Sequence, residues 1–550
     1  MDNFRLILAI MLSLLGTMIW EAWQTDYVRP KQGLTIAEPS NKSGESTEMP
    51  TIPTEAVGKG DDIPVLMDEP AGLKSIIVET DVYKMEIDTK GGTITKLWLT
   101  DYAQSTDMPE DKYLLLANNS KENYFILQSG FIGETKDAAP NHKAPFKSEN
   151  ESYKLADGSE ELTVPLIWQG TSGVTVEKKF IFRRGSYLIK MEQKVVNNSN
   201  QQWAGRDYRQ IVRRKPVAET GAGFVYTYTG GAFFSPETKF DKVEFDEMDS
   251  TALARDVMGG WIAMIQHYFI GALIPEPGEK AHFYSNKLSN NEYIIGSYGP
   301  AQRIEPGENT VFKGNFWLGP KLQQQLENTA AGLELTTDYG WLTIFAKPIF
   351  WFLNYIHQWV GNWGWSIIIL TILIKLAFYR LSAASYRSMA AMRKLSPKLQ
   401  AIKERYGEDK ERFNKAMMEL YQKEKVNPVG GCLPILVQMP VFIALYWVLL
   451  ESVELRDAPF ILWINSLSAK DPYFVLPVIM GISMLIQQKL NPTPPDPMQA
   501  KIMMALPFIF TAMFAFFPSG LVLYWVVNNI LSIAQQWRIT QVIDKAGSRD

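Results

Sequence analysis

A lysine stands inside a long apolar run of this chain. Thr371 and Lys375 lie four residues apart in Thr-Ile-Leu-Ile-Lys, and Leu-Ala-Phe-Tyr follows Lys375. In a helix this spacing places both side chains on one face, about 6 Å apart along the axis. A cation in apolar surroundings is costly and therefore indicates a functional site, although a lysine near the end of a membrane span can also extend its ammonium to the interface. Both interpretations of Lys375 stay open from the sequence.

Polar side chains also interrupt the uncharged runs further along the chain. Tyr524 with Asn528, and Trp525 with Asn529, are each four residues apart and form two adjacent faces of one predicted helix. Amides occur in two other apolar runs, at Gln438 and Gln488. Together with Thr371 and Lys375 these side chains predict a polar groove between helices, and hydrogen bonds that only join the helices are the alternative.

Metal and cofactor chemistry has little support in the sequence. The single cysteine, Cys432, excludes an internal disulfide framework and a cysteine-cluster metal site. The four histidines are far apart in sequence and belong to no metal-binding motif. We find no catalytic constellation, and we expect neither an enzyme nor a cofactor.

The apolar residues are concentrated in runs that are long enough to cross a bilayer. Five apolar runs that are free of Asp, Glu, Lys and Arg are candidates for membrane spans, at 6–20, 348–374, 426–450, 472–488 and 502–537. The last run is too long for one span, and Phe517-Pro-Ser-Gly predicts a turn near its middle. The sequence therefore predicts six transmembrane helices, the first an uncleaved anchor in preference to a signal peptide.

The basic residues predict the orientation. Between Lys375 and Lys425 there are thirteen Lys and Arg against six Asp and Glu, a net charge of +7 in a chain whose total is −4. Because positive loops stay in the cytoplasm, this segment should be cytoplasmic, and both termini then fall on the same side. The chain is predicted to be a multi-pass protein of a bacterial inner membrane.

A large β domain is predicted between the first two spans. Alternating and β-branched runs such as Val174-Thr-Val-Glu-Lys-Lys-Phe-Ile-Phe are separated by Gly, Asn and Asp turns, which is typical of an antiparallel sandwich. With the orientation above, this sandwich is periplasmic. A Pro-, Ser-, Thr- and Glu-rich stretch before it predicts a flexible linker.

The basic segment predicts a cytoplasmic helical hairpin. Apolar residues recur three or four apart on both sides of Tyr406-Gly-Glu-Asp, and Pro397 should kink the first arm or mark a boundary in it. The candidate docking residues for partners are Arg393, Lys394, Lys398 and Lys403. A solvated helix pair whose charges only orient the protein is the alternative. The hairpin lacks interleaved aromatic residues, so sequence-specific nucleic-acid binding is not expected.

The fold class is thus a polytopic α-helical membrane protein with six transmembrane helices, a large periplasmic β-sandwich domain and a cytoplasmic helical hairpin. The predicted parts are the anchor 1–23, the linker 24–60, the β-sandwich 61–335, an interfacial amphipathic segment 336–347, the second transmembrane helix 348–382, the hairpin 383–425, four further transmembrane helices 426–541 and a cytoplasmic tail 542–550.

Three long motifs carry a resemblance to a known family. They are Val426-Asn-Pro-Val-Gly-Gly-Cys-Leu-Pro-Ile-Leu-Val-Gln-Met-Pro, Ser452-Val-Glu-Leu-Arg and Phe517-Pro-Ser-Gly-Leu-Val-Leu-Tyr-Trp. In order and spacing, residues 340–540 resemble the Oxa/YidC insertase family, and the large β domain resembles its Gram-negative members. The resemblance implies a five-helix core around a polar groove that receives the polar segment of an incoming protein. It also implies that Lys375 stands where most members carry Arg, so the charge is kept but the planar guanidinium is lost.

The resemblance further implies which partners to expect. They are nascent membrane proteins as substrates, the Sec translocon for larger substrates, ribosomes and targeting factors at the hairpin, and membrane lipids. No cofactor is implied. Two other functions stay open from the residues: a secondary transporter, and a membrane-anchored periplasmic carbohydrate-active protein.

Overall fold

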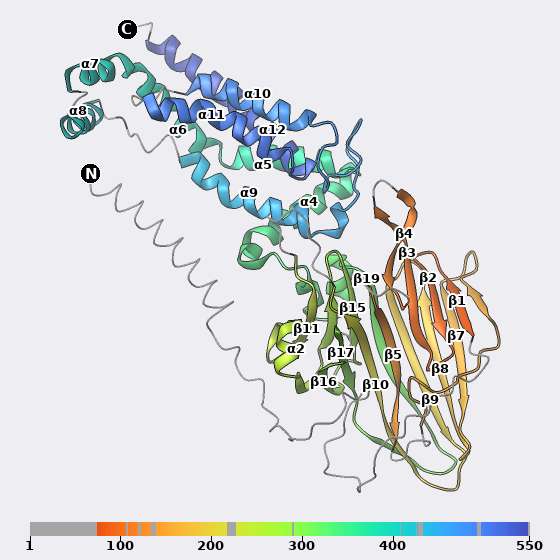
Figure 1. The fold of residues 1–550 in the computed structure, drawn as a ribbon. Helices are drawn as coiled ribbons and strands as arrows, with labels where there is room; N and C mark the ends of the chain where they lie inside the picture. Colours follow the sequence, from red (N-terminus) through yellow and green to blue (C-terminus); the bar gives the residue numbers. More distant parts are fainter. Residues whose placement is uncertain are drawn as a thin grey trace. The chain divides into compact units, whose positions relative to one another are not determined.

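The computed structural model describes residues 74–105, 108–118, 123–133, 139–216, 227–288, 291–406, 409–424, 426, 433–491 and 497–547. These residues form two compact units that divide between Thr337 and Asp338. Strands make up most of the first unit and helices most of the second (Figure 1). The predicted anchor 1–23 and linker 24–60 lie outside the described residues.

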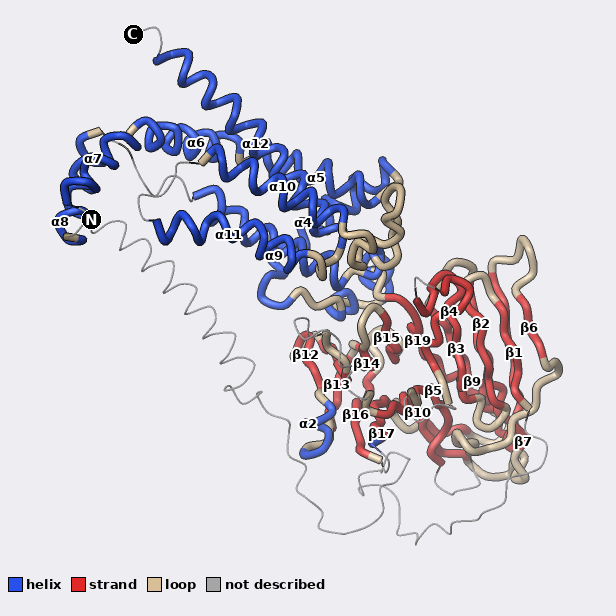
Figure 2. Tube along the Cα trace, turned by 45° about the horizontal axis from the view of Figure 1, so that its top comes forward, coloured by secondary structure: helices blue, strands red, loops and turns tan. Residues whose placement is uncertain are grey.

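The first unit contains two β-sheets, with eleven and eight strands in the described residues (Figure 2). The larger sheet consists of β1 (Ser75–Glu79), β2 (Tyr83–Asp88), β3 (Thr93–Ser105), β4 (Met108–Leu116), β5 (Phe125–Gly133), β6 (Ser152–Lys154), β10 (Trp203–Arg214), β13 (Ala254–Met258), β16 (Lys280–Lys287), β17 (Glu292–Tyr298) and β18 (Gln302–Ile304). The smaller sheet consists of β7 (Glu161–Gln169), β8 (Val174–Arg183), β9 (Leu188–Asn197), β11 (Gly230–Ser235), β12 (Lys239–Val243), β14 (Trp261–Ile265), β15 (Phe269–Ile274) and β19 (Asn309–Pro320). Two short helices, α2 (Phe245–Ser250) and α3 (Gln323–Thr329), complete the unit together with a 3-10 turn, η3 (Leu333–Thr336).

Alternating sequence explains how the sheets face each other. In β8 every second residue from Val174 to Phe182 is buried, and the residues between them are half-buried. This period of two places one face of the strand against the opposite sheet. Hydrogen bonds cross the interior, for example from the Tyr83 hydroxyl of β2 to the Leu318 carbonyl of β19, 2.6 Å away. The prediction of a two-sheet sandwich is confirmed.

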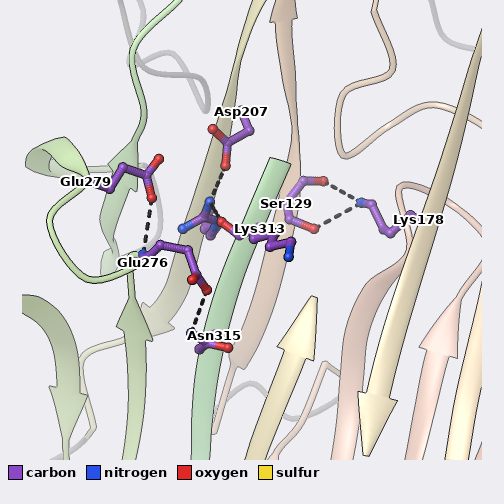
Figure 3. A network of polar contacts seen from close by, with 8 residues as sticks. Ser129, Lys178, Asp207, Glu276, Glu279, Lys313 and Asn315 are labelled. Carbon is purple, nitrogen blue, oxygen red and sulfur yellow. Dashed lines mark hydrogen bonds and ion pairs between the residues drawn. The ribbon is translucent and has the colours of Figure 1, made fainter. Parts of the chain in front are cut away.

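The alternation also places a lysine in this interior. Lys178 of β8 is fully buried, and its Nζ donates to the Gly91 carbonyl at 2.6 Å and to the carbonyl and hydroxyl of Ser129, each at 3.0 Å. Figure 3 shows the two contacts with Ser129 of β5. Three oxygen acceptors offset part of the desolvation of the ammonium, but no ion pair with Lys178 occurs in the described residues. Burial therefore lowers the pKa of Lys178 to about 7.

A second polar group joins the two sheets nearby (Figure 3). The guanidinium of Arg209 in β10 forms an ion pair with Asp207 and donates to the Lys313 carbonyl of β19. Gly314 of β19 leaves room for this guanidinium, which a Cβ at that position would strike. Beside it, the Asn315 amide donates to Glu276 at 3.1 Å. The carboxyl group of Glu279 lies close to Arg209 and Asp207, and burial raises its pKa.

The second unit is helical. It contains η4 (Gly340–Leu342), α4 (Thr343–Val360), α5 (Trp363–Ala377), α6 (Tyr379–Lys394), α7 (Ser396–Tyr406), α8 (Lys410–Lys423), α9 (Leu433–Glu451), η6 (Val453–Leu455), α10 (Val475–Leu490), α11 (Pro497–Phe514) and α12 (Ser519–Gly547). Its apolar core is formed mainly by α4, α5, α9, α10 and α12. Helix α12 packs against α5, α6, α9 and α10, and α11 packs against α10.

The prediction of one transmembrane helix over 348–382 is wrong, because the segment is divided into three. Helix α4 ends at Gly361, whose φ of 69° is in the left-handed region that glycine adopts without strain. Asn362 then caps α5 by accepting a hydrogen bond from the Trp365 amide at 3.1 Å. A third helix, α6, begins at Tyr379. Part of the predicted interfacial segment 336–347 belongs to α4.

Two predicted boundaries are confirmed. The helix before Pro397 ends at Lys394, and Pro397 stands at the second position of α7, where the missing N–H costs least. The predicted turn at Phe517-Pro-Ser-Gly separates α11 from α12. Ser519 fixes this turn by donating from its hydroxyl to the Ser466 carbonyl at 2.7 Å.

The apolar helices are short. Among the described residues no single helix has both the length and the composition to cross a membrane, whereas α5 and α6 pass together as a pair bent by 68°. Three shorter apolar helices cover Gln438–Glu451, Val475–Leu490 and Ala500–Phe514. The count of six transmembrane helices stays a prediction.

The buried Lys178 makes the stability of the β unit depend on pH. Lys178 loses its proton near pH 7 in the folded protein but near its ordinary pKa of 10.5 in the unfolded chain. Between these values the unfolded chain binds one more proton, so the free energy of unfolding should rise with pH. We expect Lys178→Met to remove this rise, measured as unfolding temperatures of the purified full-length protein at about pH 7 and about pH 9.5.

Lys179 offers the matched control for this experiment. Its side chain is partly exposed and pairs with Glu177 at 3.0 Å, so Lys179→Met should keep the pH dependence of the parent protein. An unchanged pH dependence in Lys178→Met would contradict the assignment of the titration to Lys178.

Candidate functional site

Helix α12 carries a repeating set of polar side chains. Tyr524, Asn528, Ser532 and Gln536 follow one another at intervals of four residues, which places them along one side of the helix over about 18 Å. Tyr524, Ser532 and Gln536 are buried, and Asn528 is half-buried. Because four other helices pack against α12, side chains on this helix can reach partners on several of them.

Lys375 of α5 meets α12 at Ser532. The lysine is only 7% exposed, and its Nζ donates to the Ser532 Oγ at 2.6 Å. The serine hydroxyl in turn donates to the Asn528 carbonyl of its own helix at 2.7 Å. In the part of the chain that the structure describes, no carboxylate forms an ion pair with Lys375. The ammonium is therefore turned toward α12 and held in the helix packing, instead of extending to an interface.

Two asparagines join α12 to α9 and α10. The Asn529 amide donates to the Ser483 hydroxyl of α10 at 3.0 Å, and both side chains are buried. The Asn528 amide reaches the Gln438 amide oxygen of α9 at 3.5 Å, the limit of a hydrogen bond. The first contact is a well-formed link between helices, whereas the second is long and easily exchanged.

Two glutamines continue the pattern toward the end of α12. The Gln536 amide donates to the Leu490 carbonyl at 3.3 Å and to the Asn491 side chain at 3.1 Å, at the C-terminus of α10. The Gln535 amide donates to the Tyr379 carbonyl of α6 at 3.2 Å. Gln536 therefore satisfies a carbonyl at the C-terminal end of α10, where carbonyl groups lack partners within the helix, whereas Gln535 bonds to the first residue of α6.

Thr371 and Gln488 do not join this network. Thr371 is buried on the same face of α5 as Lys375, but its hydroxyl donates to the Ile367 carbonyl of its own helix at 2.6 Å. Gln488 is half-buried on α10 and, within the described residues, forms no side-chain hydrogen bond with the other candidate residues. The structure therefore places both residues near the network without linking them to it.

The two aromatic candidates, Tyr524 and Trp525, lie in or against the apolar core of the helical unit. Tyr524 is buried, and Trp525 packs its ring against Phe442 of α9 and Phe514 of α11, with centroid distances of 4.7 and 5.4 Å. The indole Nε1 of Trp525 is buried and has no hydrogen-bond partner among the described residues. An indole N–H without an acceptor is a donor that a bound chain could use.

The sequence analysis missed Ser532, Ser483, Gln536 and Tyr386. Tyr386 of α6 is buried close to Ser532. Extending the four-residue interval from Tyr524 through Asn528 would have found Ser532 and Gln536. No comparable signal in the sequence marks Ser483 or Tyr386, because their roles depend on which helix faces α12.

The four candidate docking residues lie on α6 and α7. Arg393, Lys394 and Lys398 are exposed, and Lys403 is half-buried. Lys398 forms an ion pair with Glu424 at 2.6 Å, beyond the end of α8. Apolar side chains on the same side, including Leu395, Leu399 and Tyr421, pack α7 and α8 together. Lys398 therefore contributes to the joining of these helices.

The polar groups around α12 differ from those of a catalytic or metal site. They are a cation, hydroxyls and amides, which can receive carboxylates and backbone groups of a polypeptide. Within the described residues no group of His, Cys, Asp and Glu could hold a metal ion. The network supplies donors and acceptors inside an apolar helix bundle.

Comparisons with known proteins cover nearly the whole chain. Residues 75–352 match the family model of the YidC periplasmic domain, and residues 355–546 match that of the 60Kd inner membrane protein. The membrane protein insertase YidC of Methylococcus capsulatus is 50% identical over 552 residues, covering 100% of both chains. The membrane protein insertase YidC of Thioalkalivibrio sulfidiphilus is 50% identical over 562 residues, with the same coverage. A crystal structure of an active YidC insertase with its first transmembrane domain resolved aligns at a TM-score of 0.39 and 17% identity, covering 85% of this chain and 92% of that one.

The buried contact between Asn529 and Ser483 should stabilise the helical unit measurably. Each of Asn529→Ala and Ser483→Ala should lower stability, and the double variant should be less destabilised than the sum of the two. We expect a coupling of about 0.5–2 kcal/mol, which is typical of hydrogen bonds between membrane helices. The measurement is unfolding of the four proteins in mixed micelles, and strictly additive effects would contradict a direct contact.

Proposed function

The chain belongs to the YidC family of membrane protein insertases, and we propose that it receives the polar part of each substrate between α5, α9, α10 and α12. It is a protein of the bacterial inner membrane, and its substrates are newly made membrane proteins. Relatives that match over the full length are insertases, which decides against the transporter and the carbohydrate-active protein. The family is not one of enzymes.

The observation that carries the groove proposal is the state of Lys375. The ammonium lies among apolar helices, is bonded to a hydroxyl and has no carboxylate beside it in the described residues. A charge without a counter-charge among apolar helices costs free energy. A ligand that supplies the counter-charge would offset this cost. An acidic or polar segment of an incoming chain is the ligand that matches this site.

The remaining candidate residues fit a path for that segment. The long contact between Asn528 and Gln438 can be exchanged for contacts with a substrate backbone at small cost. The free N–H of Trp525 offers a donor to a substrate carbonyl. Thr371, Gln488 and Tyr524 complete the proposed groove, while the apolar segment of the substrate passes into lipid.

The proposed topology follows from the charges. The basic segment from Lys375 to Lys425 stays in the cytoplasm, the β-sandwich is periplasmic, and both termini are cytoplasmic. Six transmembrane helices cross the membrane, with α7 and α8 forming a cytoplasmic hairpin. In this topology the groove opens toward the cytoplasm, on the side where the C-terminal end of α12 lies.

The proposed partners follow from this arrangement. Exposed Arg393 and Lys394 of α6 face the cytoplasm and attract ribosomes, targeting factors and anionic lipid headgroups. The core acts alone on small substrates and beside the Sec translocon on larger ones. No cofactor takes part.

Substitutions of Lys375 test the proposed groove. Lys375→Arg should keep insertion near the parent level, because a flexible substrate tail offers no fixed geometry that favours one cation. Lys375→Ala should slow insertion about tenfold or more for substrates with acidic tails and less for neutral tails, since the loss of a charged hydrogen bond corresponds to about 1.5–3 kcal/mol. Lys375→Glu should be worse than Ala. The measurement is the initial rate of insertion into proteoliposomes.

A neutral-tailed substrate of the same length is the control for these variants. Equal rates for acidic and neutral tails with a folded Lys375→Ala protein, at the level of the parent, would contradict a role for the charge in the groove. A general loss for every substrate after Lys375→Glu alone would point to a structural lysine.

Charge reversal tests the proposed docking surface. Arg393→Glu with Lys394→Glu should weaken ribosome docking about tenfold, and docking to the parent protein should fall as salt rises, because the attraction is between exposed charges. The measurement is co-sedimentation of the full-length protein in nanodiscs with ribosomes. Lys398→Glu is the comparison, since it opposes Glu424 and should loosen α7 from α8. If docking changes neither with salt nor in the Arg393→Glu, Lys394→Glu variant, this surface is not the ribosome-binding surface.

A further inference from the structure

The hydroxyl of Ser532 joins α5 to α12. The residue is buried on α12 and accepts a hydrogen bond from Lys375 of α5 at 2.6 Å. Its own O–H donates to the Asn528 carbonyl at 2.7 Å. A hydroxyl has one proton and two lone pairs. With the proton donated to Asn528, the oxygen of Ser532 is left to accept from the Lys375 ammonium.

Ser532 thereby fixes the direction of the Lys375 ammonium. Lys375 lies in the last turn of α5, so its flexible side chain is close enough to a helix end to extend out of the apolar layer. The bond to Ser532 holds the side chain against α12 instead. An ammonium has three N–H donors, of which this contact uses one, so the others stay available for a ligand.

We propose that Ser532 is a positioning residue for substrate binding, which holds the Lys375 ammonium within the groove between α5 and α12. This inference rests on the proposed function of Lys375. Ser532 does not supply charge itself. It prevents the lysine from leaving the site when no substrate carboxylate is present.

Substitution of Ser532 tests the proposal through insertion rates in proteoliposomes. Ser532→Ala should slow insertion of an acidic-tailed substrate about tenfold, equivalent to about 1.4 kcal/mol, toward the rate of Lys375→Ala. A neutral-tailed substrate should be affected much less. Ser532→Thr keeps the hydroxyl and should keep the rate of the parent protein.

Thr540 provides a matched control on the same helix. Its hydroxyl donates to the Gln536 carbonyl four residues earlier at 2.9 Å, as Ser532 does to Asn528, but no lysine donates to it in the described residues. Thr540→Val should therefore keep the rate of the parent protein for both substrates. Comparing Thr540→Val with Ser532→Ala therefore separates the loss of a hydroxyl bonded to its own helix from the loss of the contact with Lys375.

The double variant separates positioning from helix packing. If Ser532 acts through Lys375, Ser532→Ala should add no further loss in a Lys375→Ala background. Additive losses, or equal losses for acidic and neutral tails, would overturn the proposal and make Ser532 a packing residue. If Lys375→Ala impairs acidic-tailed insertion but Ser532→Ala does not, the positioning role alone fails. If Lys375→Ala is itself without effect, the proposed role of the groove charge fails.

Discussion

Polar groups that are removed from water need partners, and this constraint governs the helical unit. Four polar side chains of α12 are matched to four different helices: Asn528 to α9, Asn529 to α10, Ser532 to α5 and Gln535 to α6. Apolar contacts alone would allow neighbouring helices to slide or rotate at small cost, because they are not directional. The hydrogen bonds of α12 therefore fix the relative positions of the helices.

The same network combines stability with incomplete pairing. The link from Asn529 to Ser483 is short and fully buried, whereas Asn528 reaches Gln438 only at 3.5 Å and the Trp525 N–H has no acceptor in the described residues. Well-paired groups hold the bundle, and poorly paired groups are those that the proposed groove would offer to a substrate. Lys375 belongs to both classes, since it is bonded to Ser532 but has no counter-charge among the described residues.

The two units satisfy the constraint in different ways. In the β unit the ammonium of Lys178 is surrounded by three oxygen acceptors and is fully enclosed, which leaves no donor for a ligand. In the helical unit the ammonium of Lys375 has one hydroxyl acceptor. The first arrangement is typical of a structural cation that joins two sheets. The second leaves the pairing of the charge incomplete within the described residues, as the proposed groove requires.

The sequence by itself determined the features that depend on local pattern. Alternation in β8 predicted a strand with one buried face, Phe517-Pro-Ser-Gly predicted the turn before α12, and Lys375 was recognised as a cation in an apolar run. These features follow from side-chain period and backbone preference within a few residues. The break between α4 and α5 was also encoded locally, in Gly361 and Asn362, but the long apolar run concealed it.

Only the tertiary structure decided the partners of these residues. Ser532 is 157 positions from Lys375, and Ser483 is 46 positions from Asn529, so neither contact has a local signature. Thr371 shares a helix face with Lys375, but its hydroxyl donates to its own helix, and Lys398 forms an ion pair with Glu424. Which polar groups meet depends on how each helix is rotated about its axis, and that rotation is set by the packing of all the helices together.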